Sequence, residues 1–231
     1  MKKYKLEKHG LEVFRGFTFR DKIKIKNYFE KKLFKSFGIK RKYNISSYHK
    51  WFKKERINHE KLMSATNRHF YPPNHIKNIF FSKKKIFFKN LLKLIGKYSI
   101  HDEGLGWISF RLIRPYEFKD GYPLSKKIWG PGGKIYSVIF NINNAEKYNS
   151  LGLVINSHKK KYPKKLFSNS KFCKSEFRFN GDLKKIKIDR FKIDQNDCLI
   201  FHPGLLHCEE TDIKSKSTRF SVEIRFKRIE K

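Results

Sequence analysis

The sequence predicts an α+β protein in which a helical N-terminal layer packs on a C-terminal β-barrel. Two observations carry this prediction: apolar residues recur at helical spacing over the first hundred residues, and from about residue 106 they alternate as in strands. Glycine and proline turns separate the strand-like segments, which is typical of a sandwich, barrel or jelly roll. We expect residues 1–105 to form a mainly helical, basic region. We expect residues 106–231 to form a β domain, a jelly roll or a related barrel, and the two parts to make one structural unit.

The first hundred residues read as helical after a short opening strand at residues 12–18. Asp21 is placed to cap a helix whose apolar positions are Ile23, Ile25, Tyr28, Phe29 and Leu33. A second segment with helical periodicity extends from Ile76 to Tyr98, and Tyr71-Pro72-Pro73 breaks the chain before it.

The later residues contain a series of strand-like segments. They lie at Trp107–Arg114, Lys134–Ile142, Leu151–Asn156, Glu176–Asn180, Ile186–Ile188, Cys198–His202 and Thr218–Arg228. The last of these alternates over its whole length. One face carries Phe220, Val222, Ile224 and Phe226, and the other carries Arg219, Ser221, Glu223 and Arg225. A strand of this kind has one buried apolar face and one face available for polar chemistry.

Composition excludes several classes of protein. A chain of 231 residues that is 39% hydrophobic can bury a sizeable core, so full disorder is excluded. The charge-free stretch from Ile135 to Ala145 has only 11 residues, far below the ~20 apolar residues of a membrane span. The N-terminus lacks the apolar region of a signal peptide. Three cysteines without paired spacing suit reduced thiols, and we therefore expect a cytoplasmic protein.

The net charge of +34 suggests two explanations. Lysine outnumbers arginine by 43 to 12 and alanine occurs only twice, which indicates the codon bias of an AT-rich genome. Specific nucleic-acid contacts favour arginine, so we prefer this explanation. The alternative is a basic protein that binds nucleic acid or another polyanion through residues 1–100, which hold 28 basic and 6 acidic residues. Binding of that kind would weaken steeply with salt.

The most informative segment lies near the C-terminus. A turn and a strand lead to the Pro203-Gly204 break, then to His207, a polar loop and the alternating strand that begins near Arg219. His207 lies at a strand start, where its ring can face the barrel interior, and Arg219 can enter the same interior. A buried arginine needs an anion. A ligand carboxylate is one candidate; Glu209, Glu210 and Glu223 are the structural alternatives.

This segment resembles the C-terminal half of the phytanoyl-CoA dioxygenase family, which belongs to the Fe(II)/2-oxoglutarate oxygenases. Two further stretches are similar to that family: Ile139–Lys159, which ends in Ser157-His158-Lys159, and Phe110–Pro115, followed by Asp120-Gly121. Together the resemblance covers about residues 106–228. It implies a double-stranded β-helix, or cupin-like, core. It also implies hydroxylation of a small, carbohydrate-linked substrate with Fe(II) and 2-oxoglutarate as cofactors.

The resemblance also places the ligands of the iron. The family holds iron by a His-x-Asp/Glu pair and a distal histidine. The distal histidine corresponds to His207, and the arginine that binds 2-oxoglutarate corresponds to Arg219. The His-x-Asp positions, just before Trp129, are filled by Ser125 and Lys127. A serine is a poor iron ligand and a lysine ammonium repels Fe²⁺, so we expect a degenerate iron site.

Whether the chain is an enzyme therefore stays open at this point. The alternative is a metal-independent or non-catalytic jelly-roll protein, in which Lys127 and Arg219 grip an anionic ligand. A substitute metal triad would combine His207 with His101 and Glu103, although these two precede the strand after which the family places its ligands. The expected ligand pocket consists of Arg111, Asn141, Asn143, Trp129 and Lys127, with a local salt bridge as the alternative role of Arg111.

Overall fold

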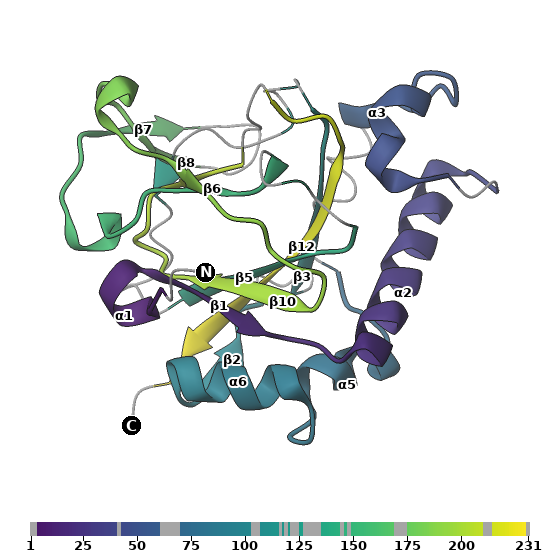
Figure 1. The fold of residues 1–231 in the computed structure, drawn as a ribbon, viewed down its shortest axis with the longest axis horizontal. Helices are drawn as coiled ribbons and strands as arrows, with labels where there is room; N and C mark the ends of the chain where they lie inside the picture. Colours follow the sequence, from purple (N-terminus) through teal and green to yellow (C-terminus); the bar gives the residue numbers. More distant parts are fainter. Residues whose placement is uncertain are drawn as a thin grey trace.

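The computed structural model describes residues 4–40, 43–60, 70–102, 107–115, 117, 120, 125–126, 135–143, 146, 149–168, 175–209 and 214–229. Within these ranges two antiparallel sheets face each other, and helices cover the outer side of one of them (Figure 1). The α+β class and the double-stranded β-helix core predicted from the sequence are confirmed.

The helices lie in the first hundred residues. The α-helices are α1 Leu6–His9, α2 Phe19–Phe37, α3 Tyr48–Trp51, α5 Asn74–Phe81 and α6 Ile86–Ile95, with a 3₁₀ turn, η1, at Ile45–Ser47. None of the described helices is long and apolar enough to cross a bilayer. In Figure 1, α2 runs along one side of the sheets, and α5 and α6 lie beneath them.

The first sheet contains the long strands. Its members are β1 Leu11–Arg15, β2 Tyr98–Ile100, β3 Ile108–Ile113, β5 Ile135–Asn141, β10 Asp197–Phe201 and β12 Arg219–Arg228. The order is β1-β10-β5-β12-β2, and β3 pairs with β12 beside β2. Since β1 and β2 belong to this sheet, the N-terminal hundred residues supply strands to the barrel as well as its helical cover.

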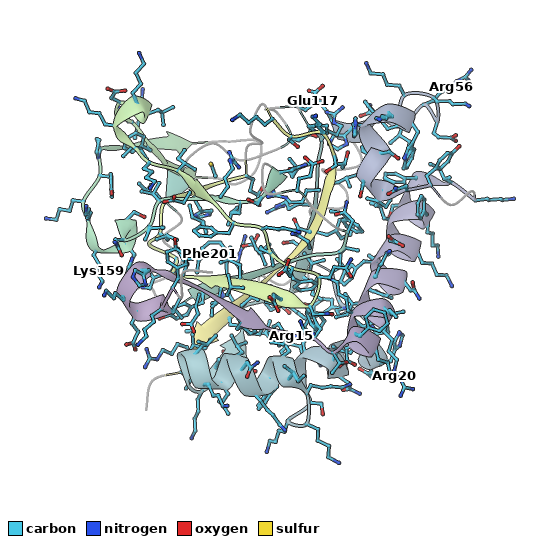
Figure 2. All side chains as sticks on the ribbon, viewed as in Figure 1. Arg15, Arg20, Arg56, Glu117, Lys159 and Phe201 are labelled. Atoms are coloured by element: carbon cyan, nitrogen blue, oxygen red, sulfur yellow. The ribbon has the colours of Figure 1, made fainter. Side chains whose placement is uncertain are left out.

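The second sheet is made of shorter strands. They are β4 Ser125–Lys126, β6 Gly152–Leu153, β7 Lys164–Ser168, β8 Ser175–Phe179, β9 Asp189–Arg190 and β11 His207–Cys208, in the order β7-β8-β4-β11-β6-β9. Apolar residues fill part of the space between the two sheets, and they include Leu153, Leu199 and Phe201. Figure 2 shows Phe201 inside the molecule, while Arg20, Arg56 and Lys159 point away from it.

The outer face of the first sheet packs against the helices. Alternate residues of β12, namely Phe220, Val222, Ile224 and Phe226, are fully buried there with apolar residues of α2, α5 and α6. Aromatic rings dominate the contact; for example, the ring centroids of Phe17 and Phe140 lie 5.0 Å apart. The alternation predicted for this strand is confirmed, and its other face is thereby directed into the barrel.

Several predicted boundaries differ from the structure. The side chain that caps α2 is Thr18, whose Oγ1 accepts a hydrogen bond from the Asp21 N–H, and Asp21 itself lies in the first turn. The segment with helical periodicity from Ile76 to Tyr98 contains two helices, because the chain turns between Ser82 and Lys85, and its last residue, Tyr98, begins β2. The residues expected as a strand at Ile186–Ile188 lie between a 3₁₀ turn and β9.

Candidate functional site

The inner face of the first sheet is polar. Along β12 it presents Arg219, Ser221, Glu223 and Arg225, all at most 5% exposed. Neighbouring strands add Ser109 and Arg111 from β3 and Ser137 and Asn141 from β5. Burial of this many polar groups is costly in free energy unless each has a hydrogen-bond or ion-pair partner. The groups that lack a partner therefore indicate where a ligand would bind.

His207 is held in a defined orientation. Its Nδ1 lies 2.8 Å from the carbonyl oxygen of Leu205, and because a carbonyl only accepts, Nδ1 carries the hydrogen and Nε2 carries the lone pair. The Leu206 N–H donates to Ser157 Oγ over 2.7 Å, which fixes the backbone just before His207. A backbone carbonyl on one ring nitrogen is the usual arrangement for a histidine whose other nitrogen binds a ligand.

The strand register brings Ser125 next to His207. Ser125 of β4 is the antiparallel partner of His207 of β11, and Leu153 of β6 is its partner on the other side. The assignment of Ser125 to the first histidine position of an iron motif stays a prediction. Lys127 and Trp129, the other predicted site residues of this segment, lie outside the described residues.

The described residues do not supply the ligand set of ferrous iron. They contain no group of three His, Cys, Asp or Glu side chains placed to hold a metal ion. His101 lies just after β2, where its backbone N–H donates to the Arg225 carbonyl over 2.9 Å. Glu103, its partner in the substitute triad, is outside the described residues, so that triad stays a prediction. The residue of β4 that pairs with His207 is a serine and not a histidine.

Arg219 is a buried cation whose Nε has no hydrogen-bond acceptor among the described residues. Its side chain is 2% exposed. Within the described ranges, no hydrogen bond or ion pair reaches the guanidinium. Burial lowers the pKa of Arg219 to about 10, and the negative charge of Glu209 opposes that shift. Arg219 therefore remains charged at neutral pH, and within the described part of the chain no anion makes the direct contact with its guanidinium that a buried guanidinium requires.

Asn141 and Asn143 differ in their environments. Both amide atoms of Asn141, Nδ2 and Oδ1, are buried without hydrogen-bond partners. Asn143 Nδ2 donates to Ser46 Oγ and to the Thr218 carbonyl, each over 2.8 Å, and its Oδ1 accepts from the Phe220 N–H. The amide of Asn143 thus ties β5 to the start of β12, and of the two predicted pocket asparagines only Asn141 has amide atoms to offer a ligand.

Arg111 forms salt bridges inside the protein, which is the alternative role that the sequence analysis gave it. Its Nε lies 3.3 Å from Glu209 Oε1, and its guanidinium lies 3.5 Å from Glu223 Oε2. Glu223 Oε1 in turn accepts hydrogen bonds from Ser137 Oγ at 2.9 Å and Arg225 Nε at 3.2 Å. These ion pairs form one network inside the barrel. Glu209 Oε2, however, is buried without a donor.

A second buried cluster lies where β3 ends, and sequence reasoning missed it. Arg114 forms two hydrogen bonds to Asp120, each 2.7 Å long, and lies 4.8 Å from the ring centre of Phe52. His59 Nε2 lies 3.2 Å from Asp120 Oδ1, and its Nδ1 lies 2.9 Å from the Tyr48 hydroxyl. Burial would raise the pKa of Asp120, but the hydrogen bonds from Arg114, together with the nearby ring of His59, outweigh it and hold that pKa below its usual range. The cluster joins the helical layer to the segment that leads to β4.

Comparisons with known proteins identify the fold. No family model matches the chain, and no curated protein matches it. Among solved structures, the chain is similar to EctD from S. alaskensis with 2-oxoglutarate and 5-hydroxyectoine, with TM-score 0.57 and 11% identity over 97% of this chain and 74% of EctD. It is similar to AviO1 from Streptomyces viridochromogenes Tue57, with TM-score 0.56 and 11% identity over 96% of this chain and 91% of AviO1.

Two more similarities extend this comparison. The α-ketoglutarate-dependent carbocyclase SnoK from nogalamycin biosynthesis gives TM-score 0.57 and 9% identity over 96% of this chain and 81% of SnoK. EvdMO1 gives TM-score 0.57 and 10% identity, and there the chain spans about half, 48%, of the matched protein. At these identities the likeness concerns the fold. The chain has the jelly-roll fold found in iron- and 2-oxoglutarate-dependent enzymes that act on small substrates.

Proposed function

We propose that this chain is a jelly-roll protein of 2-oxoglutarate oxygenase ancestry that binds a small carboxylate in its barrel through Arg219, without depending on ferrous iron. The observation that carries the proposal is the buried guanidinium of Arg219, whose Nε has no acceptor. A carboxylate would supply the missing charge and accept from the fork of N–H donors. Lys127, by its place in the sequence, is the second cation proposed to face the ligand.

The donor set argues against hydroxylation through iron. One histidine does not make a facial triad, and Ser125 stands opposite His207 where a second nitrogen ligand is needed. The alternative, an active phytanoyl-CoA dioxygenase-like enzyme, requires the His101 and Glu103 ligands. If it held, the cofactors would be Fe(II) and 2-oxoglutarate, and the reaction would hydroxylate a carbohydrate-linked substrate.

Anaerobic titration with Fe(II), with and without 2-oxoglutarate, separates the two candidates. We expect no saturable iron binding and no visible charge-transfer band from a chelated iron complex. A band that disappears in His207→Ala would overturn metal independence and make His101 and Glu103 the next residues to replace.

Carboxylate binding itself is tested by calorimetric titration of the metal-free protein in EDTA, with 2-oxoglutarate, glutarate and gluconate as probes. We expect at least one to bind, and Arg219→Gln to weaken that binding at least ten-fold, since a charged hydrogen bond to a buried carboxylate is lost. Arg228→Gln is the matched control, because Arg228 lies on the same strand with its side chain exposed. Equal loss in both variants, or no binding of any carboxylate, would contradict the proposal.

A further inference from the structure

We infer that the ligand of the barrel is a carboxylate that also carries hydroxyl groups, such as a sugar acid, and not an acceptor-only dicarboxylate such as 2-oxoglutarate. This inference rests on the proposed function, because it takes Arg219 as the carboxylate site. It adds two further buried side chains, Glu209 and Asn141, as the groups that select the ligand. Each keeps a polar atom without a partner, as Arg219 does.

The strand register places these three side chains around one point of the inner face. Ser221 follows Arg219 by two residues on β12, so both residues belong to the same face. Ser221 pairs with Asn141 on β5 and with Arg111 on β3. Arg111 in turn holds Glu209 Oε1 at 3.3 Å. Asn141 on β5 and Arg111 on β3 therefore lie diagonally from Arg219 on opposite sides of β12, and Arg111 holds Glu209.

Glu209 directly follows β11 and is held inside the barrel by its contact with Arg111. Cys208 packs with Val154 and Leu206 in a separate apolar cluster, and His207 contacts Phe201 with ring centres 4.9 Å apart. His207 therefore lies on the side of β11 opposite Cys208, and the ion pair with Arg111 places the Glu209 carboxylate against the inner face of the first sheet. The carboxylate of Glu209 is 4% exposed and is the strongest opposing charge on Arg219.

The unpartnered atoms of the three side chains need different hydrogen-bonding groups from a ligand. Arg219 Nε is a donor and needs an acceptor, which a carboxylate provides. Glu209 Oε2 is an acceptor and needs a donor. Asn141 offers a donor at Nδ2 and an acceptor at Oδ1, and a hydroxyl group can answer both because it donates and accepts.

A carboxylic acid without a hydrogen-bond donor does not satisfy all three side chains. At neutral pH, 2-oxoglutarate and glutarate carry no hydrogen-bond donor, so they leave Glu209 Oε2 unpaired and bring a second carboxylate close to its charge. A site with buried polar groups rejects a ligand that leaves them unpaired far more strongly than it rejects a change of size. A hydroxylated monocarboxylate satisfies Arg219, Glu209 and Asn141 together.

The experiment compares two probes of equal charge and equal carbon number. D-gluconate and hexanoate are both six-carbon monocarboxylates, and only gluconate carries hydroxyl groups. Calorimetric titrations of the whole chain in EDTA should show gluconate binding at least ten-fold more tightly than hexanoate or 2-oxoglutarate. Glucose, which has hydroxyl groups and no charge, should not bind detectably.

Two variants test the selecting residues. Asn141→Leu keeps the size of the side chain and removes its amide; we expect gluconate affinity to fall at least ten-fold while hexanoate affinity stays unchanged. The same variant should melt at an equal or higher temperature, because an unpaired buried amide has been removed. The melting temperature therefore distinguishes the loss of a ligand contact from unfolding of the variant. Glu209→Gln turns one acceptor into a donor and should reduce the preference for gluconate over 2-oxoglutarate.

The outcomes distinguish the inference from the proposed function. If hexanoate and gluconate bind equally and both are lost in Arg219→Gln, the barrel binds carboxylates but the selection by hydroxyl groups is wrong. If 2-oxoglutarate binds most tightly, the inference is also wrong. If no carboxylate binds, the proposed function itself fails.

Discussion

Ser125 of β4 is the cross-strand partner of His207 of β11 in the second sheet. Directly paired positions on antiparallel strands lie about 4.5–5.5 Å apart at Cβ, the right range for two ligands of one metal ion. A metal ligand introduced at position 125 would therefore be within reach of an ion bound at His207, whereas serine is a poor metal ligand. This relationship gives the first prediction.

The double variant Ser125→His with Lys127→Asp should create a metal site with His207. Loss of one outer hydrogen-bond partner of a ligand already changes metal affinity by about 10–100-fold, so supplying two ligands should change it by more. Titration with Co(II) under anaerobic conditions should give saturable visible bands in the variant and none in the unmodified chain. Adding His207→Ala to the double variant should abolish the bands; bands that survive would show that His207 is not a ligand.

Asp120→Asn should destabilise the fold strongly. The change leaves the guanidinium of Arg114 and the ring of His59 without the buried carboxylate that joins them. Breaking such a buried pair costs about 3–5 kcal/mol, measured as the free energy of unfolding in denaturant at pH 7. Glu117→Gln is the control, because Glu117 is half exposed and lies 3.9 Å from the same arginine. It should change the free energy of unfolding by less than about 1 kcal/mol.

The effect of Asp120 should also depend on pH in a defined direction. The folded pKa of Asp120 lies below its ordinary value of 3.8, so its carboxylate contributes stability above that value. The contribution disappears as the pH falls through the lowered folded pKa. The difference in unfolding free energy between the unmodified chain and Asp120→Asn should therefore narrow in acid. A difference that is unchanged from pH 7 to the acid limit of folding would contradict this.

Lys22→Met should stabilise the protein at neutral pH. Lys22 is 4% exposed, and its Nζ donates to the Asn141 carbonyl and lies 5.4 Å from the ring centre of Phe140. Burial lowers the pKa of Lys22 from 10.5 to about 8. Holding its charge inside thus costs up to roughly 3 kcal/mol at pH 7, offset in part by the hydrogen bond.

The pH dependence of Lys22 has the same sign as that of Asp120, because both folded pKa values are lowered, but it falls in the alkaline range. Between pH 8 and 10.5 the unfolded lysine holds a proton that the folded one has released, so the free energy of unfolding rises with pH over this range. Denaturant unfolding of Lys22→Met should lack this rise, and its advantage should disappear by pH 10.5. Lys24→Met, on the exposed side of the same helix, should behave like the unmodified chain.

Ser157→Ala should loosen the segment that carries His207. The variant removes the acceptor of the Leu206 N–H, a buried hydrogen bond of 2.7 Å, and leaves that N–H unsatisfied at a cost of about 1–3 kcal/mol. Chemical denaturation measures this loss. Ser36→Ala is the control, since Ser36 Oγ bonds to a helix carbonyl at the surface and its removal should be nearly neutral.

The sequence predicted the parts of the fold that depend on local periodicity. The alternation at Thr218–Arg228 correctly predicted both faces of β12, and the apolar positions Ile25, Phe29 and Leu33 are the buried face of α2. The helical periodicity from Ile76 to Tyr98 did not reveal the turn between Ser82 and Lys85 that separates α5 from α6. Lysine is common in helices, so the lysines of this turn do not interrupt the pattern. The short strands β4, β9 and β11 were equally hard to predict, since two residues do not make a pattern.

In the candidate site, too, local sequence predicted some features and tertiary structure decided the others. By itself the sequence showed that His207 and Arg219 can face the barrel interior and that no His-x-Asp pair precedes Trp129, because residue identity and alternation are local properties. Tertiary structure alone decided which polar groups have partners: Arg111 is neutralised by Glu209 and Glu223, Asn143 ties two strands together, and Asn141 and Arg219 keep buried atoms unpaired. Partnership across strands depends on register and on which strands become neighbours, and long-range packing of the whole chain sets both.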